Sequence, residues 1–218
     1  MALQLVLATH NLGKVAELRR ILAGLDVELL SAGDVDLPDV EEHGATFADN
    51  ALLKARAGAG ATGLLCAGDD SGLEVDVLGR EPGVRSARYA GAHGDDRANN
   101  ALLLQRLADV SRPRARFVCV AALAAPDGRS WTEEGRIEGV IVAPPRGDGG
   151  FGYDPLFEPL GHTRTTAEMS PREKDAISHR GLAFRALRRT VEQLAAQPLP
   201  SANSDDSGGR GRRPSASR

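Results

Sequence analysis

Apolar and polar residues along the chain follow two patterns, one typical of strands and one typical of helices. Short, largely apolar runs predict buried strands over residues 3–9, 27–31 and 64–67. Apolar residues spaced three or four apart predict helices over residues 13–25, 46–57, 96–107 and 178–194. Strands and helices therefore alternate in the first part of the chain.

Longer strands are predicted in the second part. Residues 72–78 alternate apolar and polar, and residues 116–125 and 130–142 predict two strands joined by a Pro-Asp-Gly turn at 126–128. Ser170 precedes a short helical turn. The hairpin extends a sheet, so we interpret it as structural.

The composition changes at Gln197, after which Pro, Ser, Gly and Arg replace almost all apolar residues. We expect a folded domain over residues 1–197 and a disordered tail over residues 198–218. Arginines make the tail locally basic, which leaves weak nucleic-acid contact as an alternative to solvated disorder.

Composition and charge limit the partners and the location. The chain has 218 residues, 41% of them hydrophobic, which suffices for one core that two lobes around a cleft can share. A net charge of −3 and an isoelectric point near 6.0 give no overall attraction to nucleic acid or acidic membranes, so small molecules are the expected partners. No apolar stretch approaches the roughly 20 residues of a spanning helix. Cys66 and Cys119 lie in apolar runs, as reduced thiols of a cytoplasmic protein do.

The run from Ala67 to Gly72 ends a predicted strand with two adjacent carboxylates, Asp69 and Asp70. Adjacent carboxylates repel, so at least one pKa should rise unless a cation lies between them. A bound Mg²⁺ would remove this conflict and make the pair a site. Asp, Ser and Gly also favour ordinary solvated turns, which is the alternative interpretation.

The turn from Thr9 to Lys14 joins the first strand to the first helix. Unpaired N–H groups and the helix dipole make such a turn a plausible anion cradle. The spacing is not that of a Walker A loop, and an ordinary strand-helix turn remains an alternative.

Lysine is rare in this chain, since only Lys14, Lys54 and Lys174 are lysines among 27 basic residues. A compact ammonium group suits phosphate binding, although the three could also be without a special role.

An acidic run over residues 34–42 ends in Glu41 and Glu42, just before a helix that Thr46 and Asp49 cap. Most acidic runs are solvated surface, but one of the two glutamates could help hold a metal at this helix terminus. Lys54 lies four residues after Asn50 and shares its helix face.

Two further segments suggest a ligand site. Glycines from 147 to 152 surround Phe151 and Tyr153, whose flat faces could stack on a base, although such loops are often only tight turns. His179 and Arg180 follow the predicted N-cap Ser178, where cations oppose the helix dipole. A ligand facing them would explain their position.

Taken together, five ordered motifs resemble the Ham1 or inosine triphosphate pyrophosphatase family over residues 3–196. The motifs are Thr9-His10-Asn11-Leu12-Gly13-Lys14 with Glu17, Asp69-Asp70-Ser71-Gly72-Leu73, Pro82-Gly83 with Ser86-Ala87-Arg88-Tyr89, Gly150-Phe151-Gly152-Tyr153-Asp154-Pro155, and Ser178-His179-Arg180-Gly181. The resemblance implies an α/β fold with an elongated mixed central sheet and flanking helices that form two lobes around a cleft. It also implies a homodimer and Mg²⁺-dependent hydrolysis of the deaminated purine nucleotides ITP, dITP and XTP to the monophosphate and pyrophosphate.

The resemblance also implies roles for individual residues. Asp70 would be the proton acceptor and a metal ligand, and Glu42 or Glu41 would be the second metal carboxylate. Residues implied to contact the substrate are Thr9, His10, Asn11, Leu12, Gly13 and Lys14 of the turn, Lys54 and Lys174 as phosphate cations, Ser71, Phe151, Gly152, Tyr153, Asp154, His179 and Arg180. Arg180 can only donate hydrogen bonds, so it could distinguish the keto oxygen of hypoxanthine or xanthine from the amino group of adenine.

Two other functions stay open at this stage. A purine-nucleotide sensor without turnover would share the cradle and would not need the paired carboxylates. A hydrolase of modified pyrimidine nucleotides would share the chemistry and differ in base preference.

Overall fold

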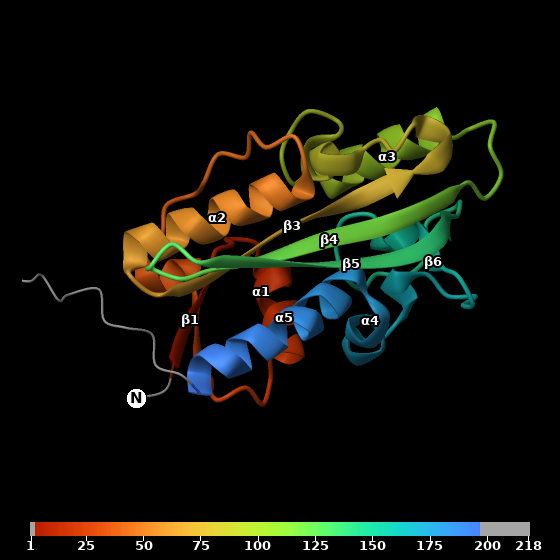
Figure 1. The fold of residues 1–218 in the computed structure, drawn as a ribbon. Helices are drawn as coiled ribbons and strands as arrows, with labels where there is room; N and C mark the ends of the chain where they lie inside the picture. The colour runs from red at the N-terminus through yellow and green to blue at the C-terminus, as the bar shows by residue number, and fades with distance from the viewer. Residues whose placement is uncertain (1–2, 197–218) are drawn as a thin grey trace, which may run out of the picture.

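The computed structural model describes residues 3–196, which form one six-stranded mixed sheet in the order β2-β1-β3-β4-β5-β6 (Figure 1). Strand β1 pairs in parallel with β2 and β3, and the remaining pairs are antiparallel. The strands are β1 Leu3–Leu7, β2 Val27–Ser31, β3 Leu65–Val75, β4 Arg114–Ala124, β5 Ser130–Ile141 and β6 Phe157–Pro159. The predicted second strand and the hairpin of β4 and β5 are confirmed.

Helices cover both faces of this sheet (Figure 1). Helices α2 and α3 lie on one face, and α1, α4 and α5 lie on the other. Their bounds are α1 Leu12–Ile21, α2 Phe47–Thr62, α3 Asp96–Arg106, α4 Pro171–Ile177 and α5 His179–Ala196. The α/β fold with an elongated mixed sheet is therefore confirmed. None of the helices within residues 3–196 is long and apolar enough to cross a membrane.

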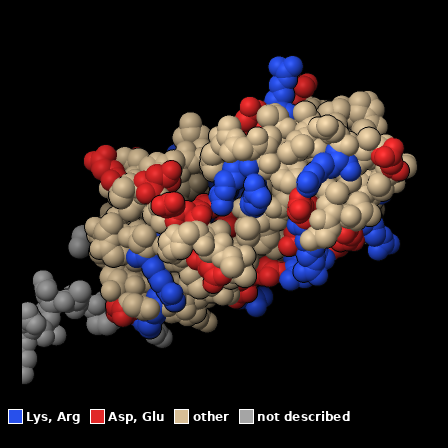
Figure 2. Space-filling view, turned by 90° about the horizontal axis from the view of Figure 1, so that it is seen from above, with Lys and Arg blue, Asp and Glu red and all other residues tan. Residues whose placement is uncertain are grey.

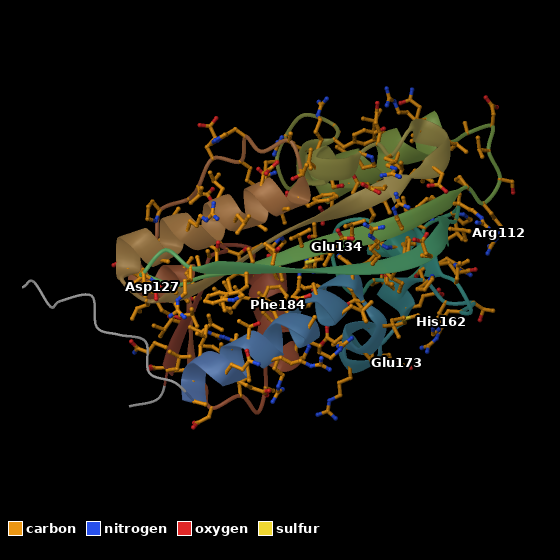
Figure 3. The ribbon with its side chains drawn as sticks, viewed as in Figure 1. Arg112, Asp127, Glu134, His162, Glu173 and Phe184 are labelled. Atoms are coloured by element: carbon orange, nitrogen blue, oxygen red, sulfur yellow. The ribbon has the colours of Figure 1, made fainter. Side chains whose placement is uncertain are left out.

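Two apolar cores lie back to back on the sheet. On the side of α1 and α5, Leu5, Leu65 and Leu123 pack against helix residues such as Phe184, which points from α5 toward the strands (Figure 3). On the other side, the alanines of α2 pack against the opposite face of the same strands. Acidic and basic side chains are interspersed over the outer surface of that second side (Figure 2).

A third core forms at the far end of β3 and β4. Here Leu73 and Phe117 of these strands pack with Leu103 of α3 and with Phe157 of β6. The long strands β3 and β4 thus run through both ends of the molecule and tie them together. This division agrees with the two lobes implied by the family resemblance.

The structure corrects the prediction for the strand that carries the aspartates. The sequence predicts a strand over residues 64–67 with Asp69 and Asp70 beyond its carboxyl end, but β3 continues without interruption to Val75. Asp69 and Asp70 pair with Ala121 and Val120 of β4. Pairing with this long apolar neighbour outweighs the local turn preference of Asp, Ser and Gly.

Helix α2 is also longer than predicted, since it continues past Ala57 to Thr62. Its glycines do not end it, because close packing on β3 favours small residues there. At Gly68 of β3 an added Cβ would lie 2.7 Å from the carbonyl oxygen of Ala51, so glycine lets helix and strand approach closely. The predicted capping box of Thr46 and Asp49 at the start of α2 is confirmed.

Candidate functional site

A cavity of about 630 Å³ lies where the two ends of the molecule meet. This volume lies within the range of small-molecule sites. The predicted site residues that line it are Thr9, His10, Asn11, Lys14, Glu41, Glu42, Lys54, Asp70, Ser71, Phe151, Gly152, Tyr153, Asp154, Lys174, His179 and Arg180. Residues distant in sequence therefore meet around one cavity.

Leu12 and Gly13 are the two predicted site residues that do not line the cavity. Leu12 is 83% exposed at the start of α1. At Gly13 an added Cβ would lie 2.9 Å from the ring of Phe151, so this glycine makes room for the aromatic side chain. Asn11 accepts from the N–H of Lys14 as the helix N-cap. The first-turn N–H groups of Leu12 and Gly13 have no partner within the helix, as at any helix start.

Asp69 and Asp70 point to opposite faces of β3, because successive side chains of a strand alternate. The carboxylate of Asp69 contacts Lys14 at 3.0 Å and Arg180 at 3.2 Å, from α1 and α5. Asp70 faces the cavity on the side of α2. The expectation that the two carboxylates share one cation is therefore wrong. The pKa of Asp70 is raised by burial and by Glu42 rather than by repulsion from Asp69, whose own pKa is lowered.

One end of the cavity, which we call the acidic end, is formed by Glu42, Asn50, Lys54 and Asp70. Asp70 accepts from the amide of Asn50 at 2.9 Å and from the N–H of Ser71 at 2.9 Å. Lys54 lies 2.7 Å from Glu42 and 3.9 Å from Asp70. Burial raises the pKa of Asp70, Glu42 adds to this, and Lys54 and Asn50 oppose it.

The acidic end fits the expected Mg²⁺, since two carboxylates already converge on the ammonium group of Lys54. Mg²⁺ typically takes one or two carboxylates and completes its shell with water and substrate phosphates. Within residues 3–196, no cluster of three or more His, Cys, Asp or Glu could hold a metal by itself. Glu42 is half-buried and turned toward Lys54, whereas Glu41 is exposed.

The other end of the cavity rests on a group of charges that we call the buried ion network, formed by Lys14, Glu17, Asp69, Asp154, Lys174 and Arg180. Glu17 contacts Lys174 at 2.8 Å and also pairs with Arg180, and Lys174 pairs with Asp154. Arg180 is only 2% exposed. Burial tends to raise the pKa of Glu17, but Arg180 and Lys174 together hold it below its ordinary value.

Aromatic side chains border the buried ion network. The ammonium of Lys174 lies 4.8 Å and the guanidinium of Arg180 lies 5.5 Å from the ring centre of Phe151. His179 stacks on Phe117 with ring centres 4.7 Å apart, and burial lowers its pKa well below the ordinary value. A flat apolar surface backed by cations therefore forms this aromatic end of the cavity.

The hydroxyl of Tyr153 donates to the carbonyl of Ser86 at 2.9 Å, and Asp154 accepts from the N–H of Phe151. Both side chains therefore hold the glycine-rich loop as well as lining the cavity. Asp154 as a whole is only 2% exposed and Tyr153 is only 4% exposed, so little of either residue is available to a ligand.

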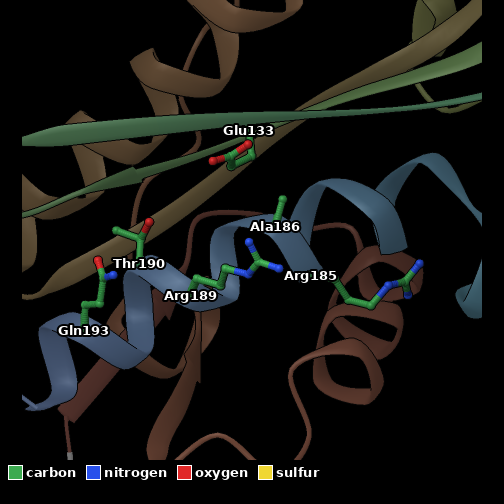
Figure 4. Close-up of a pocket in the computed structure, with 6 residues that line it drawn as sticks. All are labelled: Glu133, Arg185, Ala186, Arg189, Thr190 and Gln193. Carbon is green, nitrogen blue, oxygen red and sulfur yellow. The ribbon is translucent and has the colours of Figure 1, made fainter.

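A second hollow of about 410 Å³ lies between β5 and α5 (Figure 4). Glu133 points from the strand toward Arg189 and other residues of the helix. Arg185 of this hollow donates to the carbonyls of Asp175 and Ala176. The predicted site residues do not reach this hollow.

A profile of the Ham1 family matches residues 5–190. The chain belongs to the Ham1 family. A protein of Streptomyces avermitilis named dITP/XTP pyrophosphatase is 56% identical over 196 residues, covering 88% of this chain and 98% of that protein. A protein of the same name from Corynebacterium efficiens is 51% identical over 207 residues, covering 89% of this chain and all of that one.

Solved structures agree with this assignment to the Ham1 family. A HAM1 protein from Coxiella burnetii is 41% identical with a TM-score of 0.79, covering 88% of this chain and 99% of that one. A structure described as a nucleoside-triphosphatase / dITP/XTP pyrophosphatase from Mycobacterium abscessus is 50% identical with a TM-score of 0.68, covering 88% of this chain and 100% of that one. The family resemblance drawn from the five motifs is confirmed.

In this Ham1 chain several cavity residues were missed by the sequence analysis. They are Asp39, Val40, Gly72, Val84, Ser86, Ala87, Arg88, His93, Gly94, Asp96 and Phe117, with Ala8 at the end of β1. Arg88 belongs to one of the five motifs, and its positive charge could have marked it as a candidate for binding phosphate. Arg88 forms no ion pair within the described part of the chain, in contrast to Lys14, Lys54, Lys174 and Arg180. His93 and Asp96 belong to none of the quoted motifs, and only the tertiary fold brings the loop of His93 and the first residue of α3 to the cavity.

Proposed function

We propose that this chain hydrolyses ITP, dITP and XTP to the nucleoside monophosphate and pyrophosphate, with Mg²⁺ as cofactor. The observation that carries the proposal is the layout of one cavity. A carboxylate pair, Asp70 and Glu42, lies at one end, and a ring backed by cations, Phe151, lies at the other. The names of the relatives from Streptomyces and Corynebacterium support this choice of substrates.

Asp70 is suited to accept a proton from the attacking water. Its raised pKa makes it a better base than an ordinary aspartate, while Asn50 and the N–H of Ser71 hold the carboxylate in one orientation. Bound between Asp70 and Glu42, Mg²⁺ would lower the pKa of the water and neutralise charge on the phosphates. The half-buried position of Glu42 supports it over Glu41 as the second ligand.

Cations along the cavity would stabilise charge on the leaving pyrophosphate. Lys54 lies at the acidic end, and Lys14 lies beside the first turn of α1 with its free N–H groups. Arg88 adds a guanidinium that forms no ion pair within residues 3–196, so a phosphate could take it without breaking an existing pair. Lys174 lies instead under the ring of Phe151. We therefore propose that Lys174 serves the base rather than the phosphates.

The aromatic end supports a role in choosing the base. Hypoxanthine and xanthine present an acceptor at C6, and the donors Lys174 and Arg180 lie beside Phe151. Adenine would place an amino donor against these donors. Arg180 already donates to Glu17, Asp69 and Ser71, so much of its hydrogen-bonding capacity is committed within the protein. Guanine also has an acceptor at C6, so its exclusion must depend on its 2-amino group, near residues 151–154.

We further propose that the chain acts in the cytoplasm as a homodimer. Both proposals rest on the family resemblance and on the composition. Analytical ultracentrifugation of the purified chain tests the dimer.

Pyrophosphate release from ITP, XTP, ATP, GTP and a modified pyrimidine triphosphate tests the reaction, with Mg²⁺ and with EDTA. We expect strong release from ITP and XTP only, lost with EDTA and in Asp70→Asn. Binding of ITP without release would point to a sensor, and preference for the pyrimidine would point to a different nucleotide hydrolase.

A further inference from the structure

The backbone N–H and the backbone carbonyl of Gly152, between Phe151 and Tyr153, both bond to side chains of one helix. The N–H of Gly152 donates to Asp96 Oδ2 at 2.6 Å, and its carbonyl accepts from Asn100 Nδ2 at 3.0 Å. Asp96 and Asn100 lie one turn apart in α3 and therefore share a helix face. Neither residue was singled out by the sequence motifs.

Gly152 needs such support from outside its own loop. Its φ of 63° lies in the left-handed region, which glycine adopts readily, and it has no side chain with which to anchor itself. A loop rich in glycine loses much conformational entropy when it is fixed. Two hydrogen bonds to the backbone of Gly152, one of them to a carboxylate, offset part of that loss.

Helix α3 is itself fixed to the body of the protein. Asn99, which is 2% exposed, accepts from the N–H of Ala90 at 2.7 Å and donates to the carbonyl of Ala87 at 3.3 Å. Leu103 is fully buried in the third core. Hydrogen bonds from α3 therefore hold Gly152 against a rigid part of the fold.

The same loop is also tied to the strand that carries Asp70. Tyr153 donates to the carbonyl of Ser86, and the hydroxyl of Ser86 accepts from the N–H of Leu73 at 2.9 Å. Leu73 lies two residues after Ser71 in β3. These bonds set the position of the loop relative to the acidic end, and the bonds to Gly152 then set the position of Phe151.

We propose that Asp96 and Asn100 are positioning residues for nucleotide binding, because they hold the Gly152 peptide and so fix the ring of Phe151 at the aromatic end. This inference rests on the proposed function, in which the base stacks near Phe151. According to this inference, α3 affects how tightly the base binds and does not affect proton transfer at Asp70. Loosening the loop should weaken the binding of ligands that carry a base and should leave the binding of ligands without a base unchanged.

Calorimetry with inosine monophosphate and with inorganic pyrophosphate, both with Mg²⁺, tests the proposal without requiring turnover. We expect Asp96→Ala and Asn100→Leu to weaken inosine monophosphate binding about fivefold to tenfold, as the loss of one hydrogen bond does. Pyrophosphate binding should stay within about twofold of the wild type, since pyrophosphate has no base to stack. Asp96→Asn keeps an acceptor for the N–H of Gly152 and should restore most of the binding.

Asp95→Ala is the matched control. Asp95 caps α3 by accepting from the N–H of Ala98 at 2.9 Å, and it does not contact Gly152. Its removal should lower the stability of α3 while leaving the binding of inosine monophosphate unchanged. Combining Asp96→Ala with Asn100→Leu should weaken binding less than the two separate effects together, because both act on the backbone of Gly152.

Kinetics give a second readout, in which KM for ITP rises in Asp96→Ala and Asn100→Leu while kcat stays within about twofold. Equal weakening of inosine monophosphate and pyrophosphate would overturn the proposal, as would an equal effect in Asp95→Ala or no effect in either variant. A wild-type protein that binds inosine monophosphate but releases no pyrophosphate from ITP would refute the proposed function alone. The calorimetric comparison would still decide the role of α3.

Discussion

The acidic end and the buried ion network both contain carboxylates and cations, but they use their charges differently. In the buried ion network, Glu17, Asp69 and Asp154 face Lys14, Lys174 and Arg180, and most members contact two partners. At the acidic end, Asp70 and Glu42 share one lysine, Lys54. The first region is balanced in charge, and the second has an excess of carboxylate.

This difference separates structural charge from charge available for chemistry. Where each ion has its partner, folding lowers the pKa of the acids, as it does for Asp69 and Glu17. Where carboxylates are buried without enough cations, the pKa rises, as it does for Asp70. A raised carboxylate pKa marks a place where binding of a metal ion or a proton lowers the electrostatic free energy. Two neighbouring aspartates thus take opposite roles.

The sharpest test of the comparison exchanges each aspartate for asparagine. Asp69→Asn leaves Lys14 without its ion-pair partner and leaves Arg180 with Glu17 alone, so we expect unfolding free energy to fall by about 3–5 kcal/mol. Asp70→Asn should lower kcat about 10²-fold to 10⁴-fold and change unfolding free energy by less than about 1 kcal/mol. Urea unfolding and pyrophosphate release measure the two effects. Equal losses of stability would contradict the comparison.

The two glutamates of the acidic run, Glu41 and Glu42, give a second test of the difference between the two regions. In a Mg²⁺ titration of activity, Glu42→Gln should raise the concentration needed for half-maximal rate by about tenfold or more, because a metal ligand is lost. Glu41 is exposed and serves as the matched control, so Glu41→Gln should change this concentration by less than about twofold. The reverse result would assign the second ligand to Glu41.

Acid should lower the stability of the fold first through His179, which borders the buried ion network, and then through the acids of the network itself. The folded-state pKa of His179 lies well below 6.5, so the unfolded chain binds a proton first and stability falls as the pH drops below about 6.5. Asp69 and Glu17 also have lowered pKa values, so their stabilisation is complete above their unfolded values near 4 and is lost below them. The raised pKa of Asp70 acts in the opposite direction.

Urea unfolding between pH 7.5 and pH 4 measures this dependence. A His179→Gln variant should lack the decline that begins near pH 6.5, while the decline below about pH 4.5 should remain. Stability that is flat from pH 7.5 to pH 5 in the wild-type protein would contradict a neutral buried His179.

The smallest expected effect concerns the helix that supplies the acidic end. Thr46→Ala removes the capping box at the start of α2 and should lower unfolding free energy by about 1 kcal/mol. The value of kcat should stay within about twofold, because Asn50 and Lys54 lie further along the helix and are held by the sheet. A large loss of kcat would mean that the acidic end depends on the helix terminus itself.

The sequence by itself determined most elements and most of the residues around the cavity. Hydrophobic spacing predicted the strands and helices, because the period of apolar residues is a local property of the chain. Thr46 and Asp49 marked the start of α2, since a capping box needs only neighbouring residues. The five motifs contain Asp70 and Phe151, the resemblance that they carry implied a role for Lys54 in the same site, and all three residues line the cavity.

Only the tertiary structure decided which of those residues are paired within the fold and which are available for chemistry. Pairing with β4 extends the predicted strand past Asp69 and Asp70, and the alternation of side chains along that strand places the two carboxylates on opposite faces. Partners distant in sequence, such as Glu17 for Arg180 and Asp96 for Gly152, became visible only once the chain was folded. Burial and charge balance depend on such partners, which local sequence does not contain, so the pKa of each aspartate is a property of the fold.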